Sequence, residues 1–185
     1  MIYKLGKDFE KTFSVLIDGE ELYSKMPTYS PRFLATARSA SWNMPEGSFY
    51  RSENFMGADD ASPNISLFAT GVLVLDNAAH EQFSKKLTPA GEFLPVSISG
   101  ENYYLFNVLC VVPDDAVNVS AAVEKIDSGV HLGQSNVSFD EQYLNEKGIL
   151  IFKTKTDKLI FSYCTQTFKD QYESYGFKGI IFEPV

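Results

Sequence analysis

The stretch EFLPVSISGENYYLFNVLCVVPDDAVNV, residues 92–119, decides the fold. In its first part, residues 93–98, apolar and small polar residues roughly alternate, as they do in strands. Ser99-Gly100 is a dipeptide that turns easily, and residues 103–112 are then almost unbroken apolar, which is typical of a strand buried on both faces. Pro113 ends this strand because proline has no N–H to donate to a sheet ladder. We therefore expect a β-hairpin whose second strand is central to a sheet.

A helix is predicted over residues 77–87, just before the hairpin. Asp76 is a residue type that caps helix N-termini. Ala79, Phe83 and Leu87 follow at i, i+4 and i+8, which places them on one face of a helix. The segment is therefore expected to pack that face against the core.

A second helix is predicted near the C-terminus, over residues 165–175. Phe168, Tyr172 and Tyr175 fall on one face at helical spacing. Gly176 follows, and glycine is the residue that most often occupies the left-handed position after a helix. These two segments are the two principal helices that we expect.

Short apolar runs between turn residues predict the remaining strands. They are residues 2–5 as an edge strand, 12–19 as a strand ending in an Asp-Gly hairpin turn, 65–68, 72–75, the hairpin 148–153 and 159–163, and 177–182. Residues 121–126 are expected to form a helical turn, residues 127–136 a loop, and Asp140 to cap a helical turn that runs through Leu144. Strands interrupted by two principal helices indicate an α+β fold with a mixed, largely antiparallel sheet.

A long irregular segment is expected over residues 27–63. Prolines punctuate it, and it is rich in Ser, Asn, Gly and Asp, all of which favour turns. Its aromatic residues indicate that it packs against the rest of the protein. Long ordered loops of this kind often carry function. The chain of 185 residues is expected to form a single domain, residues 1–185.

The charge of the chain bears on its partners. The formal net charge is -8 and the sequence pI is about 4.8, which argues against binding the nucleic-acid backbone. The same charge suits a basic protein partner, whose approach it would steer. No apolar run approaches the roughly 20 residues that span a bilayer, and the N-terminus lacks the apolar region of a secretory signal. We expect a cytoplasmic protein that does not bind membranes.

The sequence contains no recognisable catalytic or cofactor motif. The patterns GxSxG, Walker A, GxGxxG, CxxC and HxxxH are all missing, so we expect no cofactor and no metal site. His80 is expected to be an exposed helix residue and His131 a loop residue. Cys110 and Cys164 are expected to be reduced thiols in the core. An alternative stays open: Cys164 precedes the C-terminal helix, where a thiol can be activated, so a small hydrolase that uses Cys164 or a carboxylate cluster is conceivable.

Acidic pairs beside turn residues offer a different use, recognition of a partner. Exposed carboxylates on loops rimmed by aromatic side chains form a surface on which a basic protein can dock. The candidate partner-binding residues are Tyr50, Phe55, Asp59 and Asp60, which share one long loop, together with Asp114 and Asp115.

Three blocks of the chain resemble one known family. They are residues 72–87, residues 91–115 with the sequence GEFLPVSISGENYYLFNVLCVVPDD, and the terminal strand-helix-strand that ends in YGFKGIIFEP, residues 175–184. Their order is similar to that in a bacterial immunity-protein family, first catalogued as a domain of unknown function and found beside polymorphic and type VI secreted toxins. Residues 64–185 carry the resemblance, and residues 1–63 match only loosely.

The resemblance implies a cytoplasmic protein without enzymatic activity. Such a protein binds and neutralises one cognate secreted antibacterial toxin by occlusion, and the acidic charge would fit a basic toxin such as a nuclease. The hydrolase and a non-enzymatic adaptor domain are the alternatives. The sequence leaves open the identity of the toxin, the surface that binds it and the oligomeric state.

Overall fold

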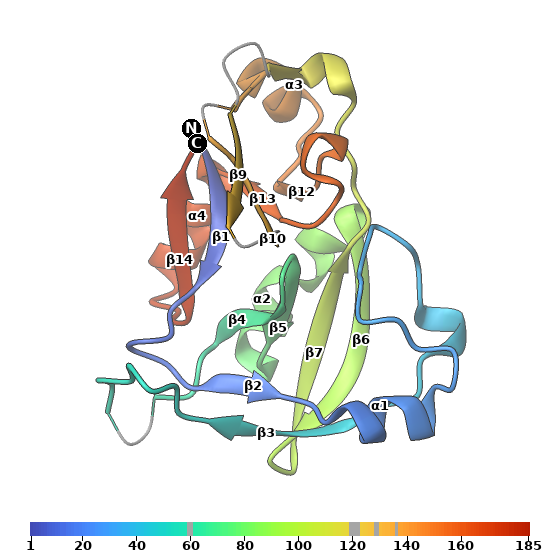
Figure 1. The fold of residues 1–185 in the computed structure, drawn as a ribbon. Coiled ribbons are helices and arrows are strands. Elements are labelled where there is room, and N and C mark those ends of the chain that lie inside the picture. Colours follow the sequence, from blue (N-terminus) through green and yellow to red (C-terminus); the bar gives the residue numbers. More distant parts are fainter. Residues whose placement is uncertain (59–60, 119–122, 128–129, 136) are drawn as a thin grey trace.

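The protein has an α+β fold built on two main sheets (Figure 1). The computed structural model describes residues 1–58, 61–118, 123–127, 130–135 and 137–185, and it describes no side chain between residues 119 and 136. The larger sheet has six strands, in the order β2 (Ser14–Leu16), β3 (Glu46–Tyr50), β6 (Gly91–Ile98), β7 (Glu101–Val108), β5 (Val72–Leu75) and β4 (Ile65–Ala69). The smaller sheet has the order β12 (Ile151–Phe152), β13 (Tyr163–Thr165), β1 (Ile2–Lys7) and β14 (Ile180–Pro184). Neighbouring strands in these two sheets are antiparallel except β3 and β6, so the larger sheet is mixed and largely antiparallel, as the sequence predicts.

The described part of the chain contains four α-helices, and both principal helices of the sequence prediction are among them. The helices are α1 (Gly19–Lys25), α2 (Asn77–Leu87), α3 (Glu141–Glu146) and α4 (Gln166–Ser174), with short 3-10 helices η1 (Ser39–Ser41), η2 (Thr88–Ala90), η3 (Asp114–Ala116) and η4 (Lys155–Asp157). The Asp76 side chain caps α2 by accepting a hydrogen bond from the Ala79 backbone N–H at 2.7 Å. Gly176 follows α4 with a φ of 68°. None of the helices in the described ranges has both the length and the apolar character needed to cross a membrane.

The hairpin predicted from the opening stretch is confirmed and its second strand is central, but that strand ends at Val108 and not at Val112, because the N–H groups of Leu109 and Cys110 both donate to the carbonyl of Ala90. Strands β6 and β7 pair in register from Gly91 opposite Val108 to Ile98 opposite Glu101. Ser99 and Gly100, both at positive φ, turn the chain between them. On its other edge β7 pairs with β5, so it is buried between two neighbours.

Alternate side chains of the hairpin enter two different cores. Leu105 of β7 packs with β2, α1 and residues 26–42 on one face of the six-stranded sheet. Phe106 packs on the other face with α2, α4 and the smaller sheet. The two helices lie behind the sheets in Figure 1 and meet through Phe83 and Phe168, whose ring centroids are 5.0 Å apart. One core is therefore shared by both sheets.

Segment 27–63 is largely irregular, as predicted, and contains η1 and β3. The Glu92 carboxylate holds this segment on the sheet, because it accepts hydrogen bonds from the backbone N–H groups of Arg38 (2.6 Å) and Ser39 (3.0 Å). The Asn107 side chain adds a bond of 2.9 Å to the carbonyl of Thr36. These bonds satisfy polar groups that would otherwise be costly to leave unpaired inside the protein.

The six-stranded sheet curls so that its two edge strands approach each other. Strand β2 lies against β4, and the Phe13 N–H donates to the carbonyl of Ala61 at 2.9 Å, just before β4 begins. The chain after β1 and the chain before β4 therefore run together at the lower left corner of Figure 1.

Several local predictions were wrong at the N-terminus. Residues 2–5 were expected at a sheet edge, but β1 lies between β13 and β14 because the C-terminal strand adds beside it (Figure 1). The Asp18-Gly19 pair does not turn a hairpin. The Asp18 side chain instead accepts a bond from the Glu20 N–H at 2.7 Å and caps α1, a helix that the pattern did not predict.

Other corrections concern the C-terminal half. The return strand expected over residues 159–163 forms later, as β13, because Lys158 and Leu159 both adopt positive φ and interrupt an extended chain. The hairpin β9 (Val123–Asp127) and β10 (Val130–Ser135) replaces the expected helical turn and loop, and residues 121, 122, 128, 129 and 136 lie outside the described residues. Strand β8 (Val117–Asn118) pairs with β11 (Ser138–Phe139), and Asp140 caps α3 as predicted.

Candidate partner-binding surface

The structure brings together some of the predicted site residues and separates others. Tyr50 ends β3, and Phe55 lies in the loop that follows it, at the lower left corner of Figure 1. Asp59 and Asp60 lie outside the described residues. Asp114 and Asp115 are exposed in η3, at the opposite, upper end of the molecule. The six residues therefore do not form one surface.

Strand β3 presents one aromatic side chain inward and the next outward. Phe49 faces the core, where its ring lies edge-on to Tyr103 at a centroid distance of 5.6 Å. Tyr50 points the opposite way, since successive strand residues alternate, and is 41% exposed. The strand thus places an exposed tyrosine next to a half-buried phenylalanine.

Phe13, just before β2, connects this pair to the next loop. Its ring centroid lies 5.2 Å from that of Phe55 and 6.1 Å from that of Phe49. The Arg51 guanidinium lies over both Phe13 (5.5 Å) and Phe55 (5.4 Å), close enough for cation–π attraction. Phe13, Phe49, Tyr50 and Arg51 line a shallow hollow of about 130 Å³.

Backbone and side-chain hydrogen bonds hold the two loops of this corner together. The Ser52 hydroxyl donates to the carbonyl of Phe9 at 2.7 Å, and the Met56 N–H donates to the carbonyl of Glu10 at the same distance. At Gly57 a side chain would collide with the carbonyl of Lys11, so only glycine permits this approach of the loops. These contacts preorganise the surface, which lowers the conformational entropy cost of binding a partner.

The outer side of the corner is unusually apolar for a loop surface. Met56 is 78% exposed, Phe9 48% and Tyr50 41%. We name this surface the aromatic corner, and it comprises Phe9, Phe13, Phe49, Tyr50, Arg51, Phe55 and Met56. Neighbouring exposed apolar side chains mark interaction sites more often than scattered ones do. Aromatic residues, Met and Arg are also the types enriched in protein–protein interfaces.

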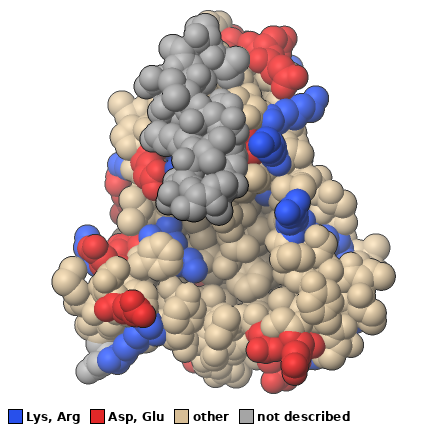
Figure 2. Space-filling model, viewed as in Figure 1, with Lys and Arg blue, Asp and Glu red and all other residues tan. Residues whose placement is uncertain are grey.

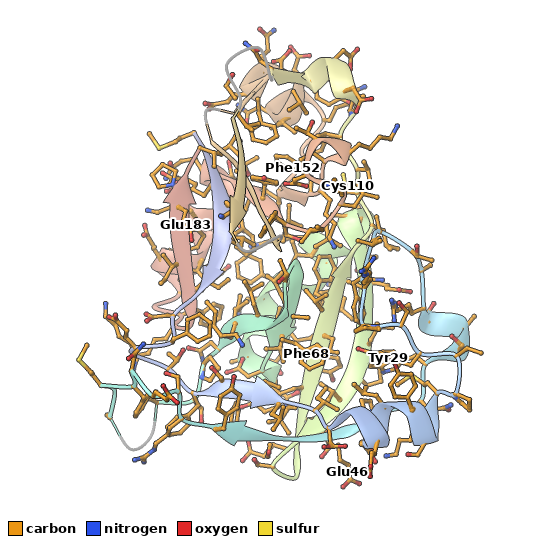
Figure 3. The ribbon with its side chains drawn as sticks, viewed as in Figure 1. Tyr29, Glu46, Phe68, Cys110, Phe152 and Glu183 are labelled. Carbon is orange, nitrogen blue, oxygen red and sulfur yellow. The ribbon has the colours of Figure 1, made fainter. Side chains whose placement is uncertain are left out.

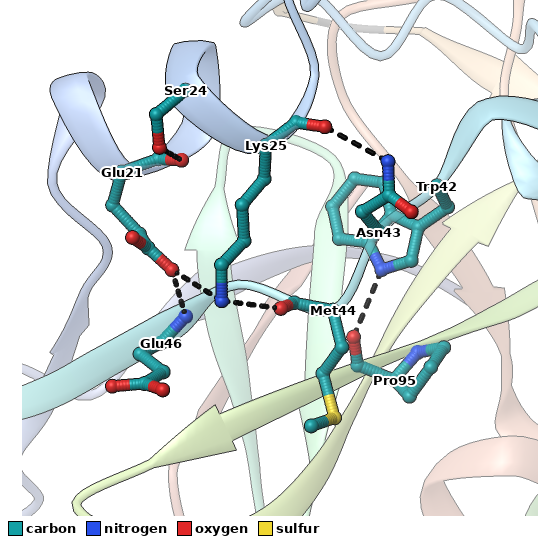
Figure 4. A network of polar contacts seen from close by, with 8 residues as sticks. All are labelled: Glu21, Ser24, Lys25, Trp42, Asn43, Met44, Glu46 and Pro95. Atoms are coloured by element: carbon teal, nitrogen blue, oxygen red, sulfur yellow. Dashed lines mark hydrogen bonds and ion pairs between the residues drawn. The ribbon is translucent and has the colours of Figure 1, made fainter.

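The other end of β3 is fixed by contacts from α1 (Figure 4). The Lys25 ammonium pairs with Glu21 at 2.8 Å and donates to the carbonyl of Met44 at 2.9 Å. Glu21 also accepts a bond from the Glu46 N–H, and the Trp42 indole N–H donates to the carbonyl of Pro95 at 2.8 Å. Hydrogen bonds from Lys25 and the Glu46 N–H hold the pKa of Glu21 below its ordinary value. Helix α1 thereby sets where β3 starts.

The cysteines occupy core positions. Cys110 lies in the upper part of the molecule (Figure 3), and Cys164 is fully buried in β13; neither forms a disulfide. Burial raises the pKa of both thiols, most strongly that of Cys164, so it disfavours the thiolate that a nucleophile needs. Within the described residues, no group of three or more His, Cys, Asp and Glu side chains is placed to hold a metal ion. These positions give the hydrolase alternative no support.

The sequence predicts an exposed His80, but the side chain is half-buried. Its ring stacks on Tyr104 at a centroid distance of 3.7 Å and meets the edge of Phe93 at 4.8 Å. Desolvation lowers the pKa of His80. The side chain of His131 lies outside those described.

No pattern in the sequence predicts that the side chain of Lys153 is buried. The Lys153 side chain is fully buried, and its ammonium donates to the backbone carbonyl of Phe33 in the irregular segment. Burial lowers the pKa of Lys153 to about 8, while Asp157 raises it and Arg38 lowers it further. The Arg38 guanidinium lies 3.8 Å over the Phe33 ring. This cluster is internal, and it ties segment 27–63 to the C-terminal half.

A second hollow, of about 210 Å³, opens beside Tyr29, Arg38 and Trp42. The Arg38 guanidinium already donates to the carbonyls of Ser30 and Arg32 at 2.6 Å each. It therefore shapes the loop, and this wall of the hollow is structural.

No family model matches this chain, and none of the curated proteins searched matches it. The sequence motifs quoted above and the geometry of the aromatic corner are therefore what bears on its function.

Proposed function

We propose that the protein is an immunity protein that binds and neutralises a cognate secreted antibacterial toxin by occlusion. The resemblance of residues 64–185 to an immunity-protein family suggests the class. The structural observation that carries the proposal is the aromatic corner, a braced group of exposed aromatic and methionine side chains on the outside of a curled sheet. The bound toxin is a protein, and its site is covered without any bond being made or broken.

The chemistry of the aromatic corner suits the centre of a protein interface. Burying Tyr50 and Met56 under a partner would remove apolar surface from water, at roughly 25 cal/mol per Å². Well-packed aromatic and methionine anchors at such centres account for most of the binding free energy. Arginine is also enriched at such interfaces, and Arg51 lies over two of the rings of the corner.

The charge of the chain adds long-range attraction. A net charge of -8 accelerates the approach of a basic protein, and many nucleases are basic because they bind a polyanion. In this proposal the toxin is a basic nuclease, and the protein meets it in the cytoplasm. Negative potential sets the association rate, and the aromatic corner sets how slowly the complex dissociates.

The proposal is tested by co-expression. If the gene next to that of this protein encodes a large secreted protein with a toxic C-terminal domain, that domain is expressed in a bacterial host with and without this protein. We expect growth to stop with the domain alone and to recover when both are present. Growth arrest that this chain does not relieve, although it is soluble and folded in the same cells, would contradict the proposal.

A matched control separates binding from folding. Tyr175 is exposed to the same extent as Tyr50, 40% against 41%, but it follows α4 and contacts Phe83 and Lys86 of α2. Tyr50→Ser should abolish rescue, while Tyr175→Ser should preserve it. Equal rescue by both variants would exclude the aromatic corner as the contact surface.

A further inference from the structure

A groove that shares only Phe9 with the aromatic corner lies at the junction of the two sheets. Its walls come from β1 and β14 of the smaller sheet and from β4 of the larger sheet, and its volume is about 420 Å³. Lys4, Leu5, Gly6, Lys7, Phe9, Leu67, Phe68, Ala69, Thr70, Phe161 and Glu183 line it. Figure 3 shows Glu183 on β14 and Phe68 near β4, on the two sides of the junction. The face drawn in Figure 2 is hollowed near its centre, with Lys or Arg side chains at the margin of the hollow.

Two ammonium groups in this groove are each held over a phenyl ring. The Lys4 ammonium lies 5.0 Å from the centroid of Phe161, and the Lys7 ammonium lies 5.4 Å from that of Phe9. Contacts of this kind hold a cation against an apolar wall without neutralising it. The groove therefore combines aromatic surface with fixed positive charge.

The positive charge of the groove exceeds its negative charge. Glu183 supplies one lining carboxylate, which pairs with Lys4 at 3.0 Å. Lys7 has no carboxylate partner among the described residues, and burial lowers its pKa because the ammonium has lost part of its hydration. A net positive groove in a chain of net charge -8 is a local feature that the overall charge does not explain.

We propose that this groove binds a small organic acid, a single carboxylate joined to an aromatic or aliphatic body. The carboxylate pairs with the Lys7 ammonium and replaces the water that burial has removed. The apolar body lies between the rings of Phe9, Phe68 and Phe161. Gly6 leaves room beside the carboxylate of Glu183, since a side chain there would approach its Oε1 to 3.1 Å.

Size and composition favour a small molecule as the occupant. Pockets for small ligands typically measure about 300–1,000 Å³ and combine apolar walls with a few converging polar groups. The groove, at about 420 Å³, meets both conditions. Phe9 belongs to both surfaces, so the titration below is made on this protein alone, and its outcome does not depend on the proposed immunity function.

The test uses 3-phenylpropionate and its neutral amide, 3-phenylpropionamide, titrated into the purified full-length protein at neutral pH by NMR. We expect the acid to bind and the amide to bind at least about tenfold more weakly, which corresponds to one charge-assisted hydrogen bond. Lys7→Met should remove the preference for the acid. Lys85→Met, which changes an exposed lysine in the last turn of α2, should leave it unchanged.

A variant that is expected to bind more tightly distinguishes a lost contact from misfolding, because a misfolded protein would not gain affinity. Glu183→Gln removes the carboxylate in the groove and should strengthen binding of the acid several-fold. Three results would each overturn the proposal: no binding of the acid at about 10 mM, equal binding of acid and amide, or an unchanged preference in a folded Lys7→Met protein.

Discussion

Lys153 makes the stability of the protein depend on pH in a way that can be calculated. Its ammonium is fully buried, and its pKa falls from an ordinary value of 10.5 to about 8. Between these two pH values the unfolded chain binds a proton at Lys153 that the folded protein lacks. Because stability rises with pH wherever the unfolded state binds more protons, this residue opposes folding below pH 8 and does so less as pH increases toward 10.5.

The size of the effect follows from the shift in the pKa of Lys153. At about 1.4 kcal/mol per pKa unit, the change from 10.5 to about 8 corresponds to roughly 3 kcal/mol across the window. Desolvation is the main cause, and the charged groups Asp157 and Arg38 act on the ammonium in opposite directions. Burial raises the pKa of Tyr163, so near pH 10 the unfolded chain loses a tyrosine proton that the folded protein keeps, and the effect of Lys153 has to be isolated by difference.

The assay is urea unfolding of the wild type and Lys153→Met at several pH values between 7.5 and 10.5. Tyrosine titration is common to both proteins and cancels in the difference between their free energies of unfolding. We expect the wild type to gain about 2–3 kcal/mol relative to the variant over this range. Methionine also removes the ammonium that donates to the Phe33 carbonyl, which adds a constant offset but no slope. Parallel pH profiles would refute the assignment of a buried, shifted lysine.

Three further predictions concern strain, thiol burial and charge. Gly71→Ala should destabilise the protein by about 2 kcal/mol more than Gly100→Ala, as measured by urea unfolding. Both glycines have positive φ, but only at Gly71 would a Cβ collide with a neighbouring backbone carbonyl. Equal losses of stability in the two variants would contradict this prediction. In a variant that lacks the other thiol, Cys164 should react with Ellman's reagent only after unfolding, and rapid reaction of the native protein would show that it is accessible. Reversing Asp59 and Asp60 to Lys should slow toxin association and reduce its dependence on salt, as followed by stopped-flow fluorescence; an unchanged rate and salt dependence would exclude these charges from steering.

Much of the fold could be predicted where local chemistry agrees with tertiary structure. Residues 77–87 form α2 as predicted because an Asp N-cap and an apolar face at helical spacing both favour a helix. The central hairpin was predictable for the same reason, since its turn residues and its apolar run specify the same structure. The hairpin turn predicted at Asp18-Gly19 was wrong because this pair is common both in hairpin turns and at the start of helices.

The candidate site was less predictable. Tyr50 and Phe55 could be proposed because they share a loop, but Phe9 and Phe13 reach the aromatic corner from another segment, through pairings that no local pattern reveals. Asp114 and Asp115 appear equivalent to other acidic pairs in sequence, yet η3 lies at the opposite end of the molecule. The burial of Lys153 could not be predicted, because its contact with the Phe33 carbonyl joins residues that are far apart in the sequence.

The most direct test of the central claim, that the aromatic corner binds a protein toxin, is an affinity measurement with two matched double variants. One combines Tyr50→Ser with Met56→Ser, and the other combines Tyr175→Ser with Ile181→Ser, which are also exposed but lie near α4 and in β14. By calorimetry with the purified toxin domain, inactivated if necessary, we expect the first to weaken binding about 100-fold, or about 2.7 kcal/mol, and the second less than about threefold. Equal affinities of the wild type and the first variant, with both proteins folded, would contradict the account.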